Sequence, residues 1–157
     1  MNGVPVPQVL LLSCYELGHQ SFGVASTVGF FDRVGVKVAA ADLAVEDISS
    51  QASHIRAARL VAISAPMHAA LRLGTKAAMQ VRAFNREVHV CFFGYYAGLN
   101  AEYLLSSGYA DSIIAGEFEP SLLELVMVVR RGEFDSASPP SGVRTAEHVS
   151  APSLQRV

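Results

Sequence analysis

Residues 9–42 read VLLLSCYELGHQSFGVASTVGFFDRVGVKVAAAD, and this stretch determines which kind of fold the chain can adopt. It begins with an apolar run at 9–14, passes through a loop into a helical pattern at 23–34, and ends in a second apolar run at 37–42. An apolar run that does not alternate with polar residues is typical of a strand buried on both faces of a parallel sheet. The stretch therefore predicts two parallel strands joined by a helix.

The same alternation of apolar runs and helical patterns continues toward the C-terminus. Further strands are predicted at 60–64, 88–93 and 112–115. Further helices are predicted at 46–59, 67–84, 100–106 and 119–131. Right-handed crossovers turn such a chain into a doubly wound sheet. We therefore predict an α/β fold, with a flavodoxin-like five-stranded parallel sheet and helices on both of its faces.

The character of the sequence changes after Gly132. Ser, Pro and Gly dominate residues 135–142, and no periodicity returns before Val157. This composition is typical of linkers and tails. We therefore predict one domain at residues 1–132 and a flexible linker or tail at 133–157. A longer native chain, of which this is a part, is one explanation of such a linker.

Composition excludes several classes of partner. The 157 residues are 51% apolar and carry a formal net charge of −2, which gives no electrostatic footprint for nucleic acid or an anionic membrane. No apolar run approaches the ~20 residues of a membrane span. The only cysteines, Cys14 and Cys91, lie far apart, and the N-terminus lacks the basic region of a signal peptide. We expect a cytoplasmic protein without nucleic-acid or membrane partners.

Ligands of doubly wound sheets bind beyond the carboxyl ends of the strands, so the residues there form the candidate site. They are mostly uncharged, and many are aromatic or glycine, which suits a bulky, partly apolar ligand. The candidates are Tyr15, Glu16, Leu17, Gly18, His19, Gln20, Phe22, Ser64, Pro66, Met67, Gly94, Tyr95, Tyr96, Gly116 and Glu117. The glycine-rich phosphate loops of nucleotide-binding proteins are missing after the first strand.

These loops resemble the cobalamin-binding domain that precedes the catalytic barrel in many radical S-adenosylmethionine (SAM) enzymes. The resemblance covers roughly residues 9–129, and its most telling parts are residues 15–20 with 23–26, 66–68 and 115–120. It implies that residues 1–132 form a cobalamin-binding, Rossmann-like domain of a B12-dependent radical SAM enzyme. Cobalamin is then the cofactor, and the candidate residues above surround it.

The wider cobalamin-binding family carries a DxHxxG motif after the first strand, whose histidine binds cobalt from below. His19 matches this histidine, whereas Leu17 stands in place of the Asp and Phe22 in place of the Gly. The Asp normally accepts a hydrogen bond from the second nitrogen of the histidine, which Leu17 cannot do. The resemblance implies that His19 is the lower axial ligand of cobalt. A pocket-lining role without ligation, and no role at all, are the alternatives.

Other positions match the family as well. Ser64 matches a serine that contacts the benzimidazole tail of the cofactor, and Gly94 and Gly116 stand where glycines let this tail pass. The iron–sulfur cluster of radical SAM enzymes needs a CxxxCxxC loop, which Cys14 and Cys91 cannot supply. The resemblance therefore implies that [4Fe-4S] and SAM belong to a partner catalytic domain, in cis or in trans, and that this chain has no catalytic residue of its own.

Two further hypotheses remain. A flavodoxin-like interaction or sensing module that has lost its cofactor is favoured by the loss of Asp and Gly from the motif. A stand-alone hydrolase or transferase is the weakest hypothesis, because no Ser–His–Asp set and no pair of carboxylates can be assigned to one edge of the sheet.

Overall fold

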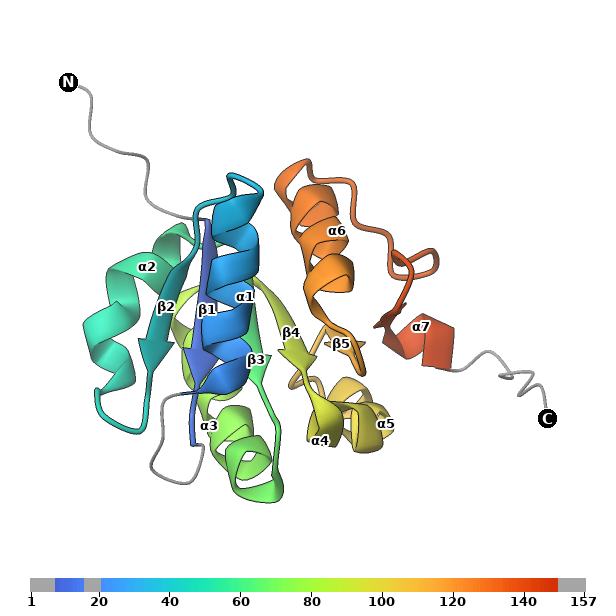
Figure 1. Cartoon of the computed structure of the whole chain (residues 1–157). Coiled ribbons are helices and arrows are strands. Elements are labelled where there is room, and N and C mark those ends of the chain that lie inside the picture. Colours follow the sequence, from blue (N-terminus) through green and yellow to red (C-terminus); the bar gives the residue numbers. More distant parts are fainter. Residues whose placement is uncertain (1–7, 16–20, 150–157) are drawn as a thin grey trace.

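The apolar runs form the strands of one sheet in the computed structural model, which describes residues 8–15 and 21–149 (Figure 1). The strands are β1 (Val9–Ser13), β2 (Ala39–Asp42), β3 (Leu60–Ser64), β4 (His89–Phe93), β5 (Ser112–Ile114) and β6 (Val143–Arg144). Their order in the sheet is β2-β1-β3-β4-β5-β6, and β1 to β5 are parallel. The predicted α/β fold is confirmed.

The predicted number of strands was wrong, because the described residues contain six strands instead of five. β6 pairs antiparallel with β5, with Val143 opposite Ile114, so the sheet is mixed. β6 lies in the segment 133–157, for which the sequence predicts no regular element, and α7 (Ala146–Val149) follows it. A two-residue strand is too short to show a periodicity. It forms because the open edge of β5 offers unpaired backbone groups.

Helices cover both faces of the sheet. They are α1 (Phe22–Arg33), the 3-10 helix η1 (Ile48–Gln51), α2 (Ala52–Ala57), α3 (His68–Phe84), α4 (Tyr95–Leu99), α5 (Ala101–Ser106) and α6 (Glu119–Arg130). In Figure 1, α1 and α6 lie in front of the sheet and α2 and α3 behind it. The helix predicted at 46–59 is divided into η1 and α2, and α4 is an additional short helix. No helix in the described ranges is both long and apolar enough to cross a membrane.

Alternate side chains of each strand enter two separate apolar clusters. On β1, Leu10 and Leu12 face the α3 side, whereas Leu11 faces α1 and α6. All five residues of β1 and of β3 are buried, which confirms that these strands are covered on both faces. The order β2-β1-β3 makes the chain reverse its direction of winding beside β1, the usual place for a ligand in such sheets. We call the end of the sheet where β1 to β5 terminate the carboxyl edge; it is the lower edge in Figure 1.

Candidate functional site

The carboxyl edge brings the described candidate residues to one end of the molecule. Tyr15 follows β1, Phe22 opens α1, Ser64 is the last residue of β3, and the remaining described candidates follow β3, β4 and β5. Glu16, Leu17, Gly18, His19 and Gln20 lie outside the described residues, so the predicted cobalt ligand stays a prediction. Among the described residues, no group of three or more His, Cys, Asp or Glu side chains is placed to hold a metal ion.

Large apolar side chains are exposed at this edge. The exposed fraction is 79% for Phe22 at the start of α1 and 83% for Val45 in the turn after β2. It is 69% for Tyr95 and 62% for Leu99, both on α4. Sequence reasoning missed Val45 and Leu99, although large apolar residues just beyond a strand or at the end of a short helix are a usable signal. Exposed apolar side chains gathered at one edge are typical of binding surfaces.

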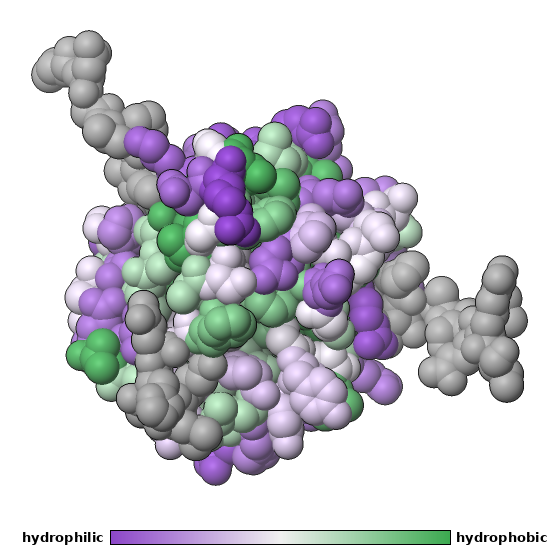
Figure 2. All heavy atoms as spheres, viewed as in Figure 1, coloured by the Kyte–Doolittle hydropathy of each residue, from purple (hydrophilic) through white to green (hydrophobic). Residues whose placement is uncertain are grey.

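Apolar surface also extends over the front of the molecule. Figure 2 shows apolar and weakly polar residues over much of the front face, interspersed with hydrophilic ones. This face is covered by α1 and α6, whose hydrophobic sides close the cluster around Leu11 and Phe93.

Aromatic packing closes the space beside Ser64. This side chain is 4% exposed and lies beneath the first turn of α1. A Cβ atom placed on Gly23 would lie 3.4 Å from Ser64 Oγ, 3.7 Å from Phe118 Cζ and 3.8 Å from Phe93 Cε2. The rings of Phe93 and Phe118 pack with their centroids 4.8 Å apart. Ser64 is therefore nearly buried, close to the first turn of α1 and to these two rings.

The two glycines at the ends of β4 and β5 have different surroundings. Gly94 has φ 112°, and a Cβ atom there would lie 3.1 Å from the carbonyl oxygen of Ala65. Gly116 has φ 72°, and nothing lies within 4 Å of its hypothetical Cβ atom. Gly94 therefore has a packing reason to be glycine. Gly116 and its neighbour Glu117 are exposed, so a ligand can approach the backbone there.

The loops after β3 and β4 are tied together. The backbone N–H of Tyr96 donates to the carbonyl oxygen of Ala65 at 3.0 Å, and the Tyr96 ring makes edge contacts with His68 and Tyr95, at centroid distances of 6.4 and 5.9 Å. Pro66 and Met67 are half-buried in the same region. Tyr96 thus connects the loop after β4 to the loop after β3, while the side chain of Tyr95 is exposed to solvent.

Both cysteines are buried and unpaired, with exposed fractions of 3% for Cys14 and 0% for Cys91. Burial raises the pKa of each thiol to about 12, and the nearby charge of Asp42 adds to the effect at Cys14. We expect neither thiol of the folded protein to react with iodoacetamide at about pH 8, because the thiolate is the nucleophile. Mass spectrometry should find both alkylated once denaturant is added. Rapid alkylation of the folded protein would contradict the buried placement.

Comparison with solved structures shows where this fold recurs. The chain is similar to the radical SAM methyltransferase TsrM from Kitasatospora setae solved with its tryptophan substrate and a SAM analogue, with a TM-score of 0.70, 16% identity and coverage of 87% of this chain and 28% of TsrM. A second TsrM structure, with cobalamin and a [4Fe-4S] cluster bound, gives the same TM-score and identity. The flavodoxin-like domain of a Synechococcus sp. protein gives a TM-score of 0.46 at 16% identity, over 80% of this chain and 85% of that domain.

Comparison of sequences gives no relative. The chain matches no family model, and no curated protein matches it significantly. At 16% identity, the likeness to TsrM establishes a shared fold. The chain spans 28% of the length of that enzyme, so what is shared is an α/β fold that forms one part of a radical SAM methyltransferase.

Proposed function

We propose that this chain is a cobalamin-binding module that acts together with a radical SAM catalytic domain, in cis or in trans. The observation that carries the proposal is the exposure of Phe22, Tyr95 and Leu99 at the carboxyl edge, since a corrin ring is large and partly apolar. The fold shared with TsrM, which has been solved with cobalamin bound, supports it. So does the resemblance of the strand-end loops to cobalamin-binding domains.

The described residues fit a flat macrocycle that lies on the edge. Phe22 and Tyr95 offer exposed rings, and Gly116 leaves its backbone open. Ser64, our candidate contact for the benzimidazole tail, is only 4% exposed in this structure. We therefore assign ring contact to Phe22, Tyr95 and Gly116. Ser64 remains our candidate for contact with the tail.

The residues of this chain would hold and shield the cofactor, which supplies a cobalt centre for methyl transfer or radical chemistry when bound. Phe22 and Tyr95 would keep water from one face of the ring, and His19 is our candidate for the lower axial ligand. The other face would be left to the partner domain, which carries the [4Fe-4S] cluster and SAM in this proposal. The two unpaired buried cysteines agree with the reducing cytoplasm that we propose as its location.

A visible absorption titration with hydroxocobalamin tests the proposal. We expect a saturable spectral shift with the unaltered chain. Phe22→Ala should weaken binding about tenfold to hundredfold, since burying such a ring is worth ~1.5–3 kcal/mol. Val34→Ala is the matched control, because Val34 is exposed at the opposite end of the same helix, α1, and should leave binding unchanged. The absence of any shift at high micromolar concentration would overturn the proposal.

His19 needs its own variant in the same titration. If His19 binds cobalt, His19→Ala should change the spectrum of the complex as well as its affinity. An identical spectrum with the variant would keep cobalamin as the ligand and remove His19 from the cobalt.

The alternative function is a flavodoxin-like interaction or sensing module without a cofactor. The burial of Ser64, which is 4% exposed beside the packed rings of Phe93 and Phe118, favours it, because a cofactor tail would need access to this side chain. The exposed side chains of Val45, Tyr95 and Leu99 would then contact a protein partner. A chain that is folded, by circular dichroism, and gives no spectral shift with hydroxocobalamin would support this alternative.

A further inference from the structure

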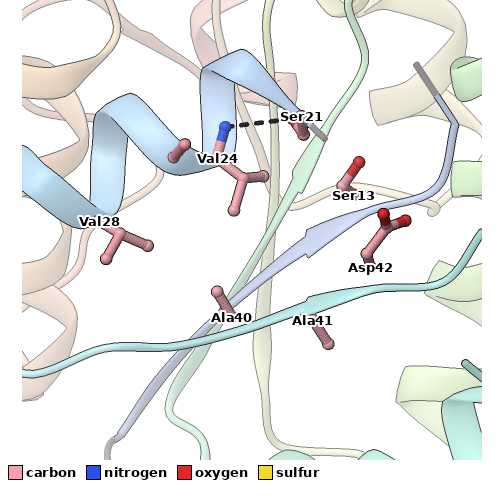
Figure 3. Close-up of a pocket in the computed structure, with 8 residues that line it drawn as sticks. Ser13, Ser21, Val24, Val28, Ala40, Ala41 and Asp42 are labelled. Atoms are coloured by element: carbon pink, nitrogen blue, oxygen red, sulfur yellow. Dashed lines mark hydrogen bonds between the residues drawn. The ribbon is translucent and has the colours of Figure 1, made fainter. Parts of the chain in front are cut away.

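A hollow of about 430 Å³ lies between α1 and the edge strand β2 (Figure 3). Its lining comes from α1 and its N-cap and from the ends of β1 and β2: Ser13, Ser21, Val24, Ala25, Val28, Ala40, Ala41 and Asp42. The volume is in the range of small-molecule sites. None of these residues belongs to the set assigned to cobalamin above, so the hollow is a separate candidate site.

The hollow exists because β2 is the edge strand and α1 is centred over β1 (Figure 1). The side of β2 that faces α1 is covered by no other helix, and its central residue, Ala40, is exposed. Alanine is too small to fill the space beside the helix. Val24 and Val28 on α1 form the opposite wall, so this part of the hollow, which we call the slot, is apolar.

A carboxylate and a hydroxyl stand together at one end of this slot. Ser13 and Asp42 are register partners on β1 and β2, and Figure 3 shows both side chains on the same side of the sheet, next to Ser21. Asp42 Oδ1 accepts the backbone N–H of Ala44 at 2.9 Å. The other carboxylate oxygen, Oδ2, accepts no hydrogen bond from the described residues. The turn therefore fixes the carboxylate and leaves an acceptor available to a ligand.

The backbone after β2 adds to this rigidity. The carbonyl oxygen of Asp42 accepts the N–H groups of Val45 and Glu46 at 3.2 and 3.1 Å, and the carbonyl oxygen of Ser13 accepts the N–H of Leu43 at 2.7 Å. Both polar side chains thus lie on backbone that is already hydrogen-bonded. Little conformational freedom is lost when such a site binds a ligand.

The chemistry of the slot selects the class of ligand. In strand–helix–strand units that bind dinucleotides, an acidic residue about 20 residues beyond the first turn accepts hydrogen bonds from ribose hydroxyls, and Asp42 has a similar place in this chain. No Lys or Arg lines the described part of the hollow, so a phosphate would find no opposite charge there. We propose that the hollow binds a neutral ribonucleoside, with its 2′,3′-diol on Asp42 and Ser13 and its base between Val24, Val28 and Ala40.

The test uses adenosine as the probe. Its binding to the whole chain is measured by calorimetry or by changes in amide chemical shifts. Asp42→Asn keeps an oxygen to accept the Ala44 N–H and removes the charge. Asp47→Asn is the matched control, because Asp47 Oδ1 accepts the N–H of Ser49 at 2.9 Å in the same kind of turn, outside the hollow. We expect saturable binding that Asp42→Asn weakens about tenfold to hundredfold, the usual loss of hydrogen bonds to a charged group, and that Asp47→Asn leaves unchanged.

The analogue 2′,3′-dideoxyadenosine lacks the 2′- and 3′-hydroxyls of the ribose and therefore tests whether these hydroxyls contact Asp42 and Ser13. The unaltered chain should bind it at least tenfold more weakly than it binds adenosine, and Asp42→Asn should show a smaller preference for adenosine over the analogue than the unaltered chain does. Equal affinity of the unaltered chain for adenosine and its dideoxy analogue would overturn the proposal, as would the absence of binding up to the solubility limit of adenosine. Neither result depends on whether the chain binds cobalamin.

Discussion

Replacement of Gly94 by alanine is expected to lower the free energy of unfolding by about 3 kcal/mol. Gly94 has φ 112° and ψ 177°, a backbone conformation that is nearly restricted to glycine. A Cβ atom there would also lie 3.1 Å from the carbonyl oxygen of Ala65. This carbonyl cannot easily retreat, because it accepts the N–H of Tyr96 at 3.0 Å while the Ala65 N–H donates to Phe93 at 2.8 Å.

Urea unfolding followed by circular dichroism measures this loss, and two other glycines serve as controls. Gly116→Ala should cost only about 1 kcal/mol, because its φ of 72° is left-handed but nothing lies within 4 Å of the new methyl group. Gly29→Ala should stabilise the chain by up to ~1 kcal/mol, since Gly29 lies in α1 with open space around it. Equal losses at Gly94 and Gly116 would show that the contact with Ala65 has no energetic weight.

A second large effect is expected on acidification, at His89 on β4. His89 Nε2 lies 2.8 Å from Ser112 Oγ, and its ring packs against Phe134 with a centroid distance of 4.5 Å. Burial lowers the pKa of His89 to about 4, the charge of Asp111 opposes this shift, and Arg82 adds to it. Arg82 and Asp111 form an ion pair with a distance of 3.2 Å. The folded protein therefore keeps this imidazole neutral.

The direction of the pH dependence follows from where the proton binds. In the unfolded chain His89 takes up a proton below its ordinary pKa of 6.5, whereas in the folded chain it does so only near pH 4. Between these values the unfolded state binds more protons, so the free energy of unfolding falls as the pH falls, by about 1.4 kcal/mol per pH unit. The total contribution is about 3 kcal/mol, fully present above pH 6.5 and lost once the pH reaches about 4.

Urea unfolding at a series of pH values separates this contribution from that of other groups. His89→Phe should be less stable at neutral pH, because the hydrogen bond between His89 and Ser112 is lost, but its stability should fall less steeply than that of the unaltered chain between pH 6.5 and 4. His54→Phe is the control, since it also replaces a histidine by phenylalanine but at a site away from His89. His54 lies on α2, and its ring contacts Gln51. Parallel pH profiles for the unaltered chain and His89→Phe would contradict the assignment.

The sequence by itself determined the class of fold, because the signals that specify its elements are local. The run from Val9 to Leu12 has no polar residue that could face water, so it must be covered on both sides, and the helical stripe that follows supplies the cover. The same reasoning placed the candidate site at the carboxyl edge. It could also identify residues that follow strands, such as Tyr95 and Gly116, without knowing their environment.

Only the tertiary structure decided what these residues contact. Gly94 and Gly116 look alike in the sequence, yet Ala65 crowds one and leaves the other open. The sequence suggests Ser64 as a contact for a ligand, whereas the structure shows that this side chain is 4% exposed. The pairing of Ser13 with Asp42 and the formation of β6 depend on strand register. Periodicity is a property of neighbours along the chain, whereas register and side-chain packing arise between residues that are distant in sequence. The hollow, the closed aromatic cluster and the sixth strand therefore became visible only in three dimensions.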